Sequence, residues 1–302
     1  MIKLWIISEQ QVSKNNLNRH LSVLVRLTRV RLSLMVSISA MTGYFLTGSS
    51  PEVVLIFLFA GVFLLASGTS VLNQVQECQQ DALMKRTTRR PIPAGEVSLT
   101  TALLIASVLI LGGTFLLSLN GWFPMLLGLS NIVFYNLIYT PLKIRSWLAI
   151  IPGALVGAVP PLIGWTSAGF YIFHPNAIFI ATFVFLWQIP HFWLLMIKYG
   201  KEYELAGFSS ISKILTERQI KSVVFGWGVI TSLFLMLFPL FGFNLKPILM
   251  VSLIVINLLF ISLFHRFLFR DSSPHTIRKA FILINTYALA VFLFLVINAM
   301  IF

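Results

Sequence analysis

Three oxygen-bearing side chains follow one another at intervals of four residues in the first third of the chain. They are Asn73, Glu77 and Asp81, in a polar stretch directly after an apolar one. If the apolar segment continues as a helix, each interval advances the chain by about 400°, so the three side chains line one stripe, about 6 Å apart along the axis. Carboxylate and amide oxygens suit Mg²⁺, which commonly keeps waters and substrate phosphates as its other ligands. The stripe predicts a magnesium site, and the competing interpretation is a solvated helix end.

Basic residues come immediately after this stripe: Lys85, Arg86, Arg89 and Arg90. Acids for a metal beside bases for an anion are expected of a diphosphate site, because arginine and lysine pair strongly with phosphate oxygens. Only nine of the 302 residues are acidic, so this grouping favours the metal–diphosphate interpretation over the solvated helix end. We place Lys85 and Arg86 with the stripe as catalytic candidates. Arg89 and Arg90 are diphosphate-binding candidates.

A second mixture of acids and bases occupies residues 198–204. If it faces the first loop at the same membrane surface, Glu202 becomes a further candidate metal ligand. Four more bases at this surface are candidates for diphosphate binding: Lys143, Arg145, Lys198 and Lys201. On its own this second group is a weak indication, because its role depends on whether the fold brings the two stretches together.

The elements that must position these groups are membrane-spanning helices. Hydrophobic residues make up 58% of the chain and charged residues only 10%, whereas soluble domains are about a quarter charged. A bilayer absorbs that much apolar surface, because helices satisfy their own backbone hydrogen bonds in lipid. We predict an all-α polytopic membrane protein, a bundle of nine transmembrane helices. The spans are Val30–Leu46, Val53–Leu72, Leu99–Leu119, Trp122–Tyr139, Trp147–Ala168, Ala177–Ile197, Val223–Phe241, Pro247–Phe264 and Ala280–Ile301.

The basic residues also indicate an orientation. With a cytoplasmic N-terminus, every lysine and arginine except Lys246 falls on the cytoplasmic side, as the positive-inside rule expects. The net charge of +13 is therefore attributed to these loops, and no nucleic-acid partner is expected. We predict a cytoplasmic N-terminal tail over residues 1–26 and one membrane domain over residues 27–302. The two long loops that carry the candidate site both lie on the cytoplasmic side.

The fifth predicted span contains features that concern packing. Pro160 and Pro161 interrupt the helical hydrogen-bond ladder and predict a kink. Gly153, Gly157 and Gly164 fall on one helical face and allow a neighbouring helix to approach closely. We favour an architectural role for these residues over substrate contact.

Four stretches of the chain resemble the UbiA-like intramembrane prenyltransferases, and within them the protoheme IX farnesyltransferase (heme O synthase) branch. The resemblance covers about Leu27 to Asn298 and spans almost the whole of the predicted membrane domain. The stretches are residues 73–98, with DALMKRT at 81–87 and RPIPAG at 90–95, then YTPLK at 139–143, GAVPPLIGW at 157–165 and WQIPHFW at 187–193.

The resemblance implies a fold and a reaction. The fold is a nine-helix bundle whose active site opens to the cytoplasm, in the inner (plasma) membrane. The reaction transfers the farnesyl group of farnesyl diphosphate to a vinyl group of heme b, with Mg²⁺ assisting the loss of diphosphate, and water completes the side chain of heme O. The resemblance also implies a place in terminal oxidase assembly, with a heme A synthase as a partner.

Several positions depart from the family's pattern and keep alternatives open. The middle acid of the stripe is Glu77 where the family usually has Asp, Gln79 occupies a position where another Asp is common, and Lys201-Glu202 replaces a pair of Asp. The metal count is therefore open. The alternatives are a prenyltransferase acting on a quinone precursor or another tetrapyrrole, and a degenerate, non-catalytic heme-binding relative. A transporter or channel is disfavoured, because its charges are expected at mid-membrane.

One histidine lies inside a predicted span. His191 follows a proline in the inner half of the sixth span, and a polar side chain within a membrane segment is a functional candidate by default. We consider it a heme-binding candidate, through the iron or a propionate. A structural histidine bonded to a neighbouring helix is an equally weighted interpretation.

Overall fold

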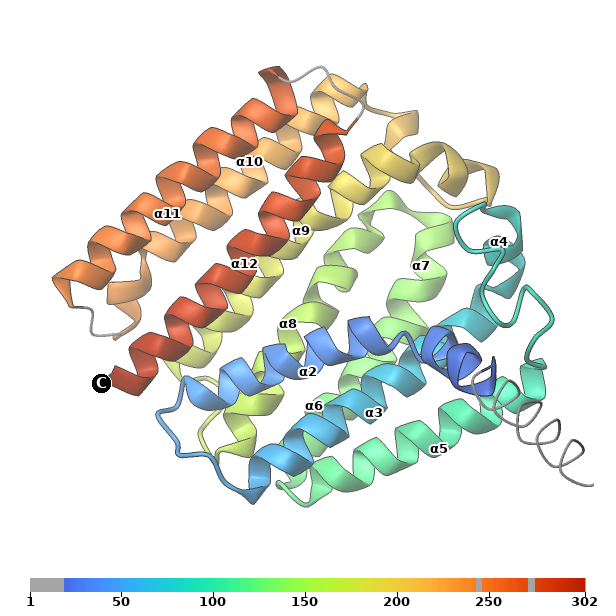
Figure 1. The fold of residues 1–302 in the computed structure, drawn as a ribbon, viewed down its shortest axis with the longest axis horizontal. Coiled ribbons are helices and arrows are strands. Elements are labelled where there is room, and N and C mark those ends of the chain that lie inside the picture. Colours follow the sequence, from blue (N-terminus) through green and yellow to red (C-terminus); the bar gives the residue numbers. More distant parts are fainter. Residues whose placement is uncertain (1–18, 243–245, 271–274, 302) are drawn as a thin grey trace, which may run out of the picture.

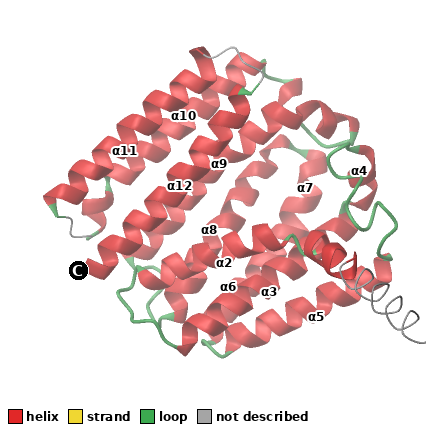
Figure 2. Ribbon diagram, viewed as in Figure 1, coloured by secondary structure: helices red, strands yellow, loops and turns green. Residues whose placement is uncertain are grey.

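The computed structural model describes residues 19–242, 246–270 and 275–301. Within these ranges the chain is helical, with no strand (Figures 1 and 2). Its elements are α2 (Val30–Phe45), α3 (Val53–Gln76), α4 (Cys78–Leu83), α5 (Leu99–Ser118), α6 (Trp122–Ile132), η1 (Val133–Tyr139), α7 (Thr140–Arg145), η2 (Trp147–Ala149), α8 (Ile150–Ser167), α9 (Pro175–Leu205), η3 (Ile211–Lys213), α10 (Glu217–Met236), η4 (Phe238–Phe241), α11 (Pro247–His265), η5 (Arg266–Arg270) and α12 (Thr276–Ile301). The predicted all-α class is confirmed.

Eight helical segments of the described chain are long and apolar enough to cross a membrane, and α2, with 16 residues, is a shorter apolar helix. Together they overlap all nine predicted spans. The count of nine transmembrane helices and the cytoplasmic N-terminus stay predictions. So does the division at residue 27, and residues 1–18 of the predicted tail lie outside the described residues.

One predicted boundary is wrong in a way that concerns the site. The sixth span was expected to end at Ile197, with residues 198–204 in a loop. Instead α9 runs from Pro175 to Leu205 as one helix of 31 residues. The charged residues after Ile197 continue the helix beyond its apolar part, and an apolar pattern alone does not detect such an extension.

Two groups of helices pack on either side of α8 and α9, which lie against each other (Figure 1). In the first group α2 packs on α8, and α3 packs on α5. In the second group α10 and α12 pack against α9, and α11 packs against α10 and α12. The contact between α2 and α8 is close because both helices carry glycine there. A Cβ at Gly164 would lie 1.7 Å from the carbonyl oxygen of Ala40, and one at Gly43 would lie 1.9 Å from that of Pro161.

The three predicted packing glycines of α8 contact three different neighbours. A Cβ at Gly153 would meet the ring of Tyr139, one at Gly157 the amide of Gln188, and one at Gly164 the backbone of α2. The prediction of close packing along this face is confirmed. Pro160 and Pro161 lie inside α8, which nevertheless remains a helix from Ile150 to Ser167.

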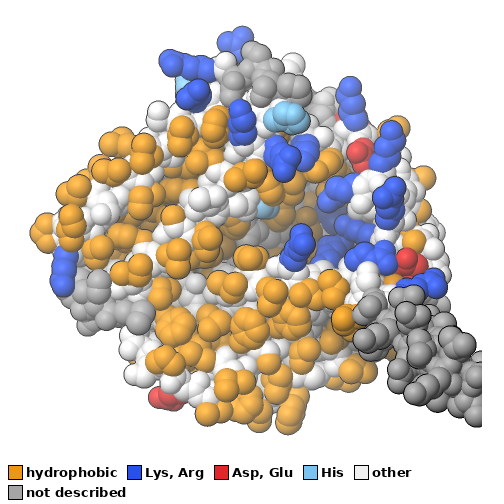
Figure 3. Space-filling model, in the orientation of Figure 1, with side chains coloured by type: hydrophobic (Ala, Val, Ile, Leu, Met, Phe, Trp, Pro, Cys, Tyr) orange, Lys and Arg blue, Asp and Glu red, His pale blue; other side chains and the backbone are white. Residues whose placement is uncertain are grey.

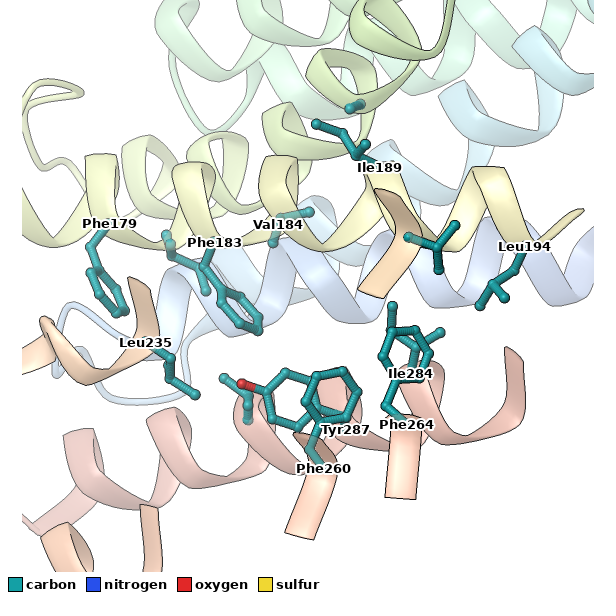
Figure 4. Packing of buried hydrophobic residues seen from close by; sticks show 14 of the residues in the cluster. Phe179, Phe183, Val184, Ile189, Leu194, Leu235, Phe260, Phe264, Ile284 and Tyr287 are labelled. Atoms are coloured by element: carbon teal, nitrogen blue, oxygen red, sulfur yellow. The ribbon is translucent and has the colours of Figure 1, made fainter. Parts of the chain in front are cut away.

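Aromatic side chains fill the core of the second group (Figure 4). The ring of Phe260 stacks on that of Tyr287, with centroids 4.0 Å apart. The Tyr287 hydroxyl donates to Asn257 Oδ1 at 2.9 Å, and Ser232 donates to the same oxygen. A polar side chain within an apolar bundle joins helices in this way because its alternative is an unsatisfied group in hydrocarbon. This network therefore ties α10, α11 and α12 together.

Charged side chains gather at one end of the bundle. Figure 3 shows lysine and arginine around α4 and around the neighbouring ends of α11 and α12, whereas hydrophobic side chains cover most of the remaining visible face. The opposite end of this face, near the start of α11, shows little positive charge. The fold thus collects at one surface the bases that the sequence placed on one side of a membrane.

Candidate functional site

The predicted stripe of oxygen ligands runs through the junction of α3 and α4. The helix is interrupted at Glu77, whose backbone has φ −103° and ψ 14°. Nevertheless, the N–H of Glu77 donates to the carbonyl of Asn73 at 2.9 Å, and the N–H of Asp81 donates to that of Glu77 at 2.8 Å. These bonds keep the helical spacing across the interruption. Asn73, Glu77 and Asp81 are all buried, with 1%, 5% and 0% of their surface exposed.

Each acid of the stripe forms an ion pair with a base. Lys143, at the end of the fourth span, pairs with Glu77. Arg90, from the loop after α4, pairs with Asp81. The side chains of Glu77 and Asp81 are 7% and 1% exposed, so both carboxylates are shielded from water. In each of the two ion pairs, a carboxylate that could bind a metal is in direct contact with a base that could bind an anion.

The amide of Asn73 is fixed at both ends. Its Oδ1 accepts from Arg29 Nη2 at 3.2 Å, and its Nδ2 donates to Thr140 Oγ1 at 3.1 Å. The Thr140 hydroxyl donates in turn to the carbonyl of Tyr135 at 2.8 Å. Arg29 was not among the predicted site residues, because nothing in the local sequence distinguishes it from the other bases near α2.

A π-helical segment supplies the second wall of the site. η1 lies between α6 and α7, and its side chain Asn136 donates to the carbonyl of Thr69 at 3.3 Å and to Gln76 Oε1 at 3.0 Å. Gln76 Nε2 returns a bond to the carbonyl of Asn136 at 3.0 Å. π-helical turns are frequent at functional sites because they re-aim side chains without ending the helix. Here the turn locks the fourth span against the last turns of α3.

The first long loop touches the end of α9. The guanidinium of Arg86 lies over the rings of Tyr199 and Tyr203, 5.0 and 5.8 Å from their centroids, and donates to the Tyr203 hydroxyl at 3.1 Å. The backbone N–H of Arg86 donates to Glu202 Oε2 at 3.4 Å. The two charged stretches of the sequence are therefore brought together, and Glu202 sits next to the basic loop.

The predicted bases differ in how close they lie to the stripe. Lys143 also approaches aromatic faces, with its ammonium 4.8 Å from the centroid of Tyr139 and 5.6 Å from that of Phe208. Six predicted bases are solvent-exposed: Lys85, Arg86, Arg89, Arg145, Lys198 and Lys201. The structure thus separates three bases, Arg90 and Lys143 in contact with the stripe and Arg86 bridging from the first loop to α9, from an outer set that makes neither contact.

Electrostatics at Arg90 show how crowded the positive charge is. Burial lowers the pKa of the Arg90 guanidinium, and the positive charge of Arg29 lowers it further, while its partner Asp81 acts in the opposite direction. An arginine remains protonated under these conditions. The site therefore holds two guanidinium groups within electrostatic range of one carboxylate.

His191 lies away from the stripe, among aromatic rings of α9 and α12. The centroid of its imidazole is 5.1 Å from that of Trp187 and 4.7 Å from that of Phe281. The side chain of Asn285 also lies within electrostatic range of the imidazole. Within the described residues its Nδ1 has no hydrogen-bond partner. Both interpretations of this histidine, heme-binding and structural, therefore remain compatible with its surroundings.

The donor set of the stripe fits a hard divalent cation. Asp81 Oδ1 is buried and lacks a hydrogen-bond partner among the described residues. No group of three His, Cys, Asp or Glu side chains occurs in the described part of the chain, so a site of protein carboxylates alone is not formed. Two carboxylates and one amide match Mg²⁺, which typically takes one or two carboxylates and completes its shell with water and phosphate.

Comparisons with known proteins find a matching family and named relatives. A profile of the UbiA prenyltransferase family matches residues 36–297. A protein of Christiangramia forsetii named protoheme IX farnesyltransferase is 33% identical over 267 residues, which cover 86% of this chain and 87% of that protein. One of the same name from Geobacter sulfurreducens is 42% identical over 181 residues, which cover 60% of this chain and 67% of that protein.

Solved structures share the fold at low sequence identity. A UbiA homolog from Archaeoglobus fulgidus bound to GPP and Mg²⁺ superposes with a TM-score of 0.69 at 14% identity, covering 93% of this chain and 100% of that one. A structure of digeranylgeranylglyceryl phosphate synthase gives a TM-score of 0.74 at 16% identity, covering 93% of this chain and 99% of that one.

Proposed function

Because the chain belongs to the UbiA prenyltransferase family, we propose that it transfers the farnesyl group of farnesyl diphosphate to a vinyl group of heme b, which yields heme O. The relatives from C. forsetii and G. sulfurreducens carry the name of that reaction. The observation that carries the proposal is the buried stripe of Asn73, Glu77 and Asp81, with a base in contact with each carboxylate. An acid–base pairing of this kind suits a metal-bound diphosphate and no uncharged substrate.

Mg²⁺ is the cofactor that the stripe would hold, through Asn73, Glu77 and Asp81, with Glu202 as a further ligand candidate. When bound, it neutralises the charge that develops on the departing diphosphate. The A. fulgidus homolog, which shares the fold, was solved with GPP and Mg²⁺.

The bases of this chain perform the complementary task. In the structure Lys143 and Arg90 are neutralised by Glu77 and Asp81. With Mg²⁺ held by the two carboxylates, Lys143 and Arg90 would be available beside it to bind diphosphate oxygens with charge-assisted hydrogen bonds. Arg86 approaches from the loop side, held by the rings of α9. The exposed bases Lys85, Arg89, Arg145, Lys198 and Lys201 form an outer set that attracts the anion to the site.

Aromatic side chains lie beside the groups that contact the stripe, since Lys143 approaches the ring of Tyr139 and Thr140 bonds to the carbonyl of Tyr135. The rings of Tyr135 and Tyr139 stack with centroids 5.6 Å apart, and Tyr139 contacts Phe192 of α9 at 6.3 Å. Loss of diphosphate breaks the C1–O bond and leaves allylic positive charge on the farnesyl group. Aromatic faces stabilise such charge and exclude water that would otherwise capture it. The vinyl group then forms the new C–C bond, and water adds to the neighbouring carbon and releases a proton.

His191 is the residue we assign to heme b. It lies on α9, eleven residues before Glu202, a rise of about 16 Å along the helix. A heme held near His191 therefore lies deeper in the bundle than the diphosphate. The unpartnered Nδ1 is available to the iron or, when protonated, to a propionate. A multi-pass protein of the inner membrane with its site on the cytoplasmic face, acting in terminal oxidase assembly with a heme A synthase, is the cellular setting we propose.

The test is formation of heme O by membranes that contain the chain, supplied with heme b, farnesyl diphosphate and Mg²⁺ and assayed by mass analysis of extracted heme. Asp81→Asn and Glu77→Gln are each expected to lower the rate by about 100-fold or more, because each removes charge that stabilises the leaving group. Glu217→Gln is the matched control, since that carboxylate is 65% exposed and distant in sequence.

Unchanged heme b in the presence of the wild-type chain would remove the acceptor assignment. In that case the same membranes are assayed with a quinone precursor as acceptor, which separates the prenyltransferase chemistry from the choice of acceptor. Wild-type rates in Asp81→Asn would remove the magnesium site.

A further inference from the structure

Arg29 has an unusual backbone conformation. It precedes α2 with φ 48° and ψ 50°. No other non-glycine residue in the described part of the chain has a positive φ. Side chains with a Cβ rarely adopt this left-handed conformation, because it costs free energy that the surroundings must offset. Such residues cluster at functional sites. The conformation aims the Arg29 side chain back at the end of α3.

The contacts of Arg29 are with neutral groups. Its Nη2 donates to Asn73 Oδ1 at 3.2 Å, across 44 residues of sequence, and its charge lies near enough to the Tyr135 hydroxyl to interact with it electrostatically. Asn73 belongs to the stripe and Tyr135 is linked to it through Thr140, and neither side chain carries a charge that would neutralise the guanidinium. Arg29 is thus held in place without being neutralised.

The balance of charge at the site makes Arg29 a surplus cation. Four ion pairs occur among the described residues: Arg26–Glu96, Arg90–Asp81, Lys143–Glu77 and Lys221–Glu217. None includes Arg29, although Arg29 lies near enough to Arg90 to affect it electrostatically. A partly buried guanidinium beside another one is unfavourable unless an anion joins them. The diphosphate of the proposed substrate is an anion that could join the two guanidinium groups.

We propose that Arg29 is a diphosphate-binding residue that also orients the Asn73 amide toward the metal site. The inference rests on the proposed function, because it assigns Arg29 to the diphosphate of the same substrate. The planar fork of an arginine suits both tasks, since one N–H holds the amide oxygen while others remain for phosphate oxygens. The alternative role is a structural tether between the start of α2 and the end of α3.

Binding of inorganic pyrophosphate separates the two roles. The full chain is purified in detergent, and pyrophosphate is titrated calorimetrically in the presence of Mg²⁺. Arg29→Gln keeps a donor for Asn73 but loses the charge, and Arg29→Gly removes the side chain together with the backbone strain. Each variant is expected to bind pyrophosphate about 10- to 100-fold more weakly, the range of one charge-assisted hydrogen bond. Arg31→Gln is the matched control, because Arg31 is exposed two residues away.

A structural tether predicts a different pattern. Loss of a structural tether would lower the thermal midpoint of both variants and leave their affinity for pyrophosphate within twofold of wild type. An affinity within twofold of wild type in either folded variant overturns the proposal. Two variants are used because Arg29→Gly relieves strain and keeps the test open if Arg29→Gln is unstable. A wild-type chain that binds no pyrophosphate would refute the proposed function itself, which distinguishes the two failures.

Discussion

Replacing Lys143 with methionine tests the central idea, that the acids of the site are neutralised by bases until a metal takes their place. Methionine preserves the apolar stem of the lysine and removes the ammonium group. Glu77, whose side chain is 7% exposed, is then left as a buried carboxylate without its cation. Removing one partner of a buried ion pair costs about 3–5 kcal/mol. Because the Lys143 side chain is itself 18% exposed, we expect the lower end, about 3 kcal/mol.

A double-mutant cycle isolates the pair. Lys143→Met/Glu77→Gln removes both charges and should recover most of the loss, leaving about 1 kcal/mol for the lost contacts of the ammonium with Tyr139 and Phe208. The coupling free energy is therefore about 2 kcal/mol or more. Since 1 kcal/mol shifts the midpoint of a large domain by about 2–4 °C, Lys143→Met should unfold about 6–12 °C below wild type. The assay is the thermal midpoint in detergent.

The effect of Mg²⁺ on the thermal midpoint distinguishes wild type from Lys143→Met most clearly. In the wild type the cation must displace Lys143 from Glu77, whereas in Lys143→Met the carboxylate is free. A tenfold tighter site adds about 1.4 kcal/mol of stabilisation at saturating Mg²⁺. Mg²⁺ should therefore raise the midpoint of Lys143→Met more than that of wild type, although the variant binds pyrophosphate less well.

The control is Lys221→Met, which breaks a pair of the same type on the surface. Its partner Glu217 is 65% exposed, so the loss should stay below about 1 kcal/mol and should not respond to Mg²⁺. The reasoning is refuted if the Glu77–Lys143 cycle is additive within about 0.5 kcal/mol, or if Mg²⁺ stabilises wild type and Lys143→Met equally.

Two further predictions concern the acceptor and the packing. His191→Phe should lower heme O formation and the absorbance of heme bound to the chain. Mg²⁺-dependent binding of pyrophosphate should stay at the wild-type value. A parallel loss of pyrophosphate binding would show that the histidine is structural. Gly164→Ala should destabilise the chain by about 1–3 kcal/mol or more, because its methyl group would lie 1.7 Å from a backbone oxygen of α2. Gly112→Ala, whose methyl group would meet its nearest neighbour at an ordinary 3.6 Å, should be neutral in the same thermal assay.

Local features of the chain were predictable from its sequence. An apolar run of about 20 residues must form a helix in a bilayer, because only a helix satisfies its backbone hydrogen bonds within the run. The apolar runs therefore located most of the helices to within a few residues. The Asn73, Glu77 and Asp81 stripe was equally accessible, because a four-residue interval on a helix determines a shared face wherever that helix lies. The interruption at Glu77 leaves this face intact, since the backbone bonds on either side retain helical spacing.

The extension of α9 shows what a hydropathy pattern does not predict. Its last residues are charged, and charge is compatible with a loop or with a helix that leaves the membrane. Contacts decide between them, since Glu202 and Tyr203 receive Arg86 from the first loop. Hydropathy describes the solvent around a segment, and it does not describe the partners that stabilise a segment outside the membrane.

The sequence by itself determined the class of fold, the positions of the helices and the shared helical face of Asn73, Glu77 and Asp81, because each depends on neighbours within a few residues. Only the tertiary structure decided which bases serve that stripe. Arg90 and Lys143 reach it, Lys85 and Arg145 remain in solvent, and Arg29 joins it from a distant helix end. All five are cations beside a membrane surface and look alike in one dimension. What distinguishes them is the packing of α2, α3 and the fourth span, which sets distance and burial, and these two quantities govern the strength of an electrostatic interaction.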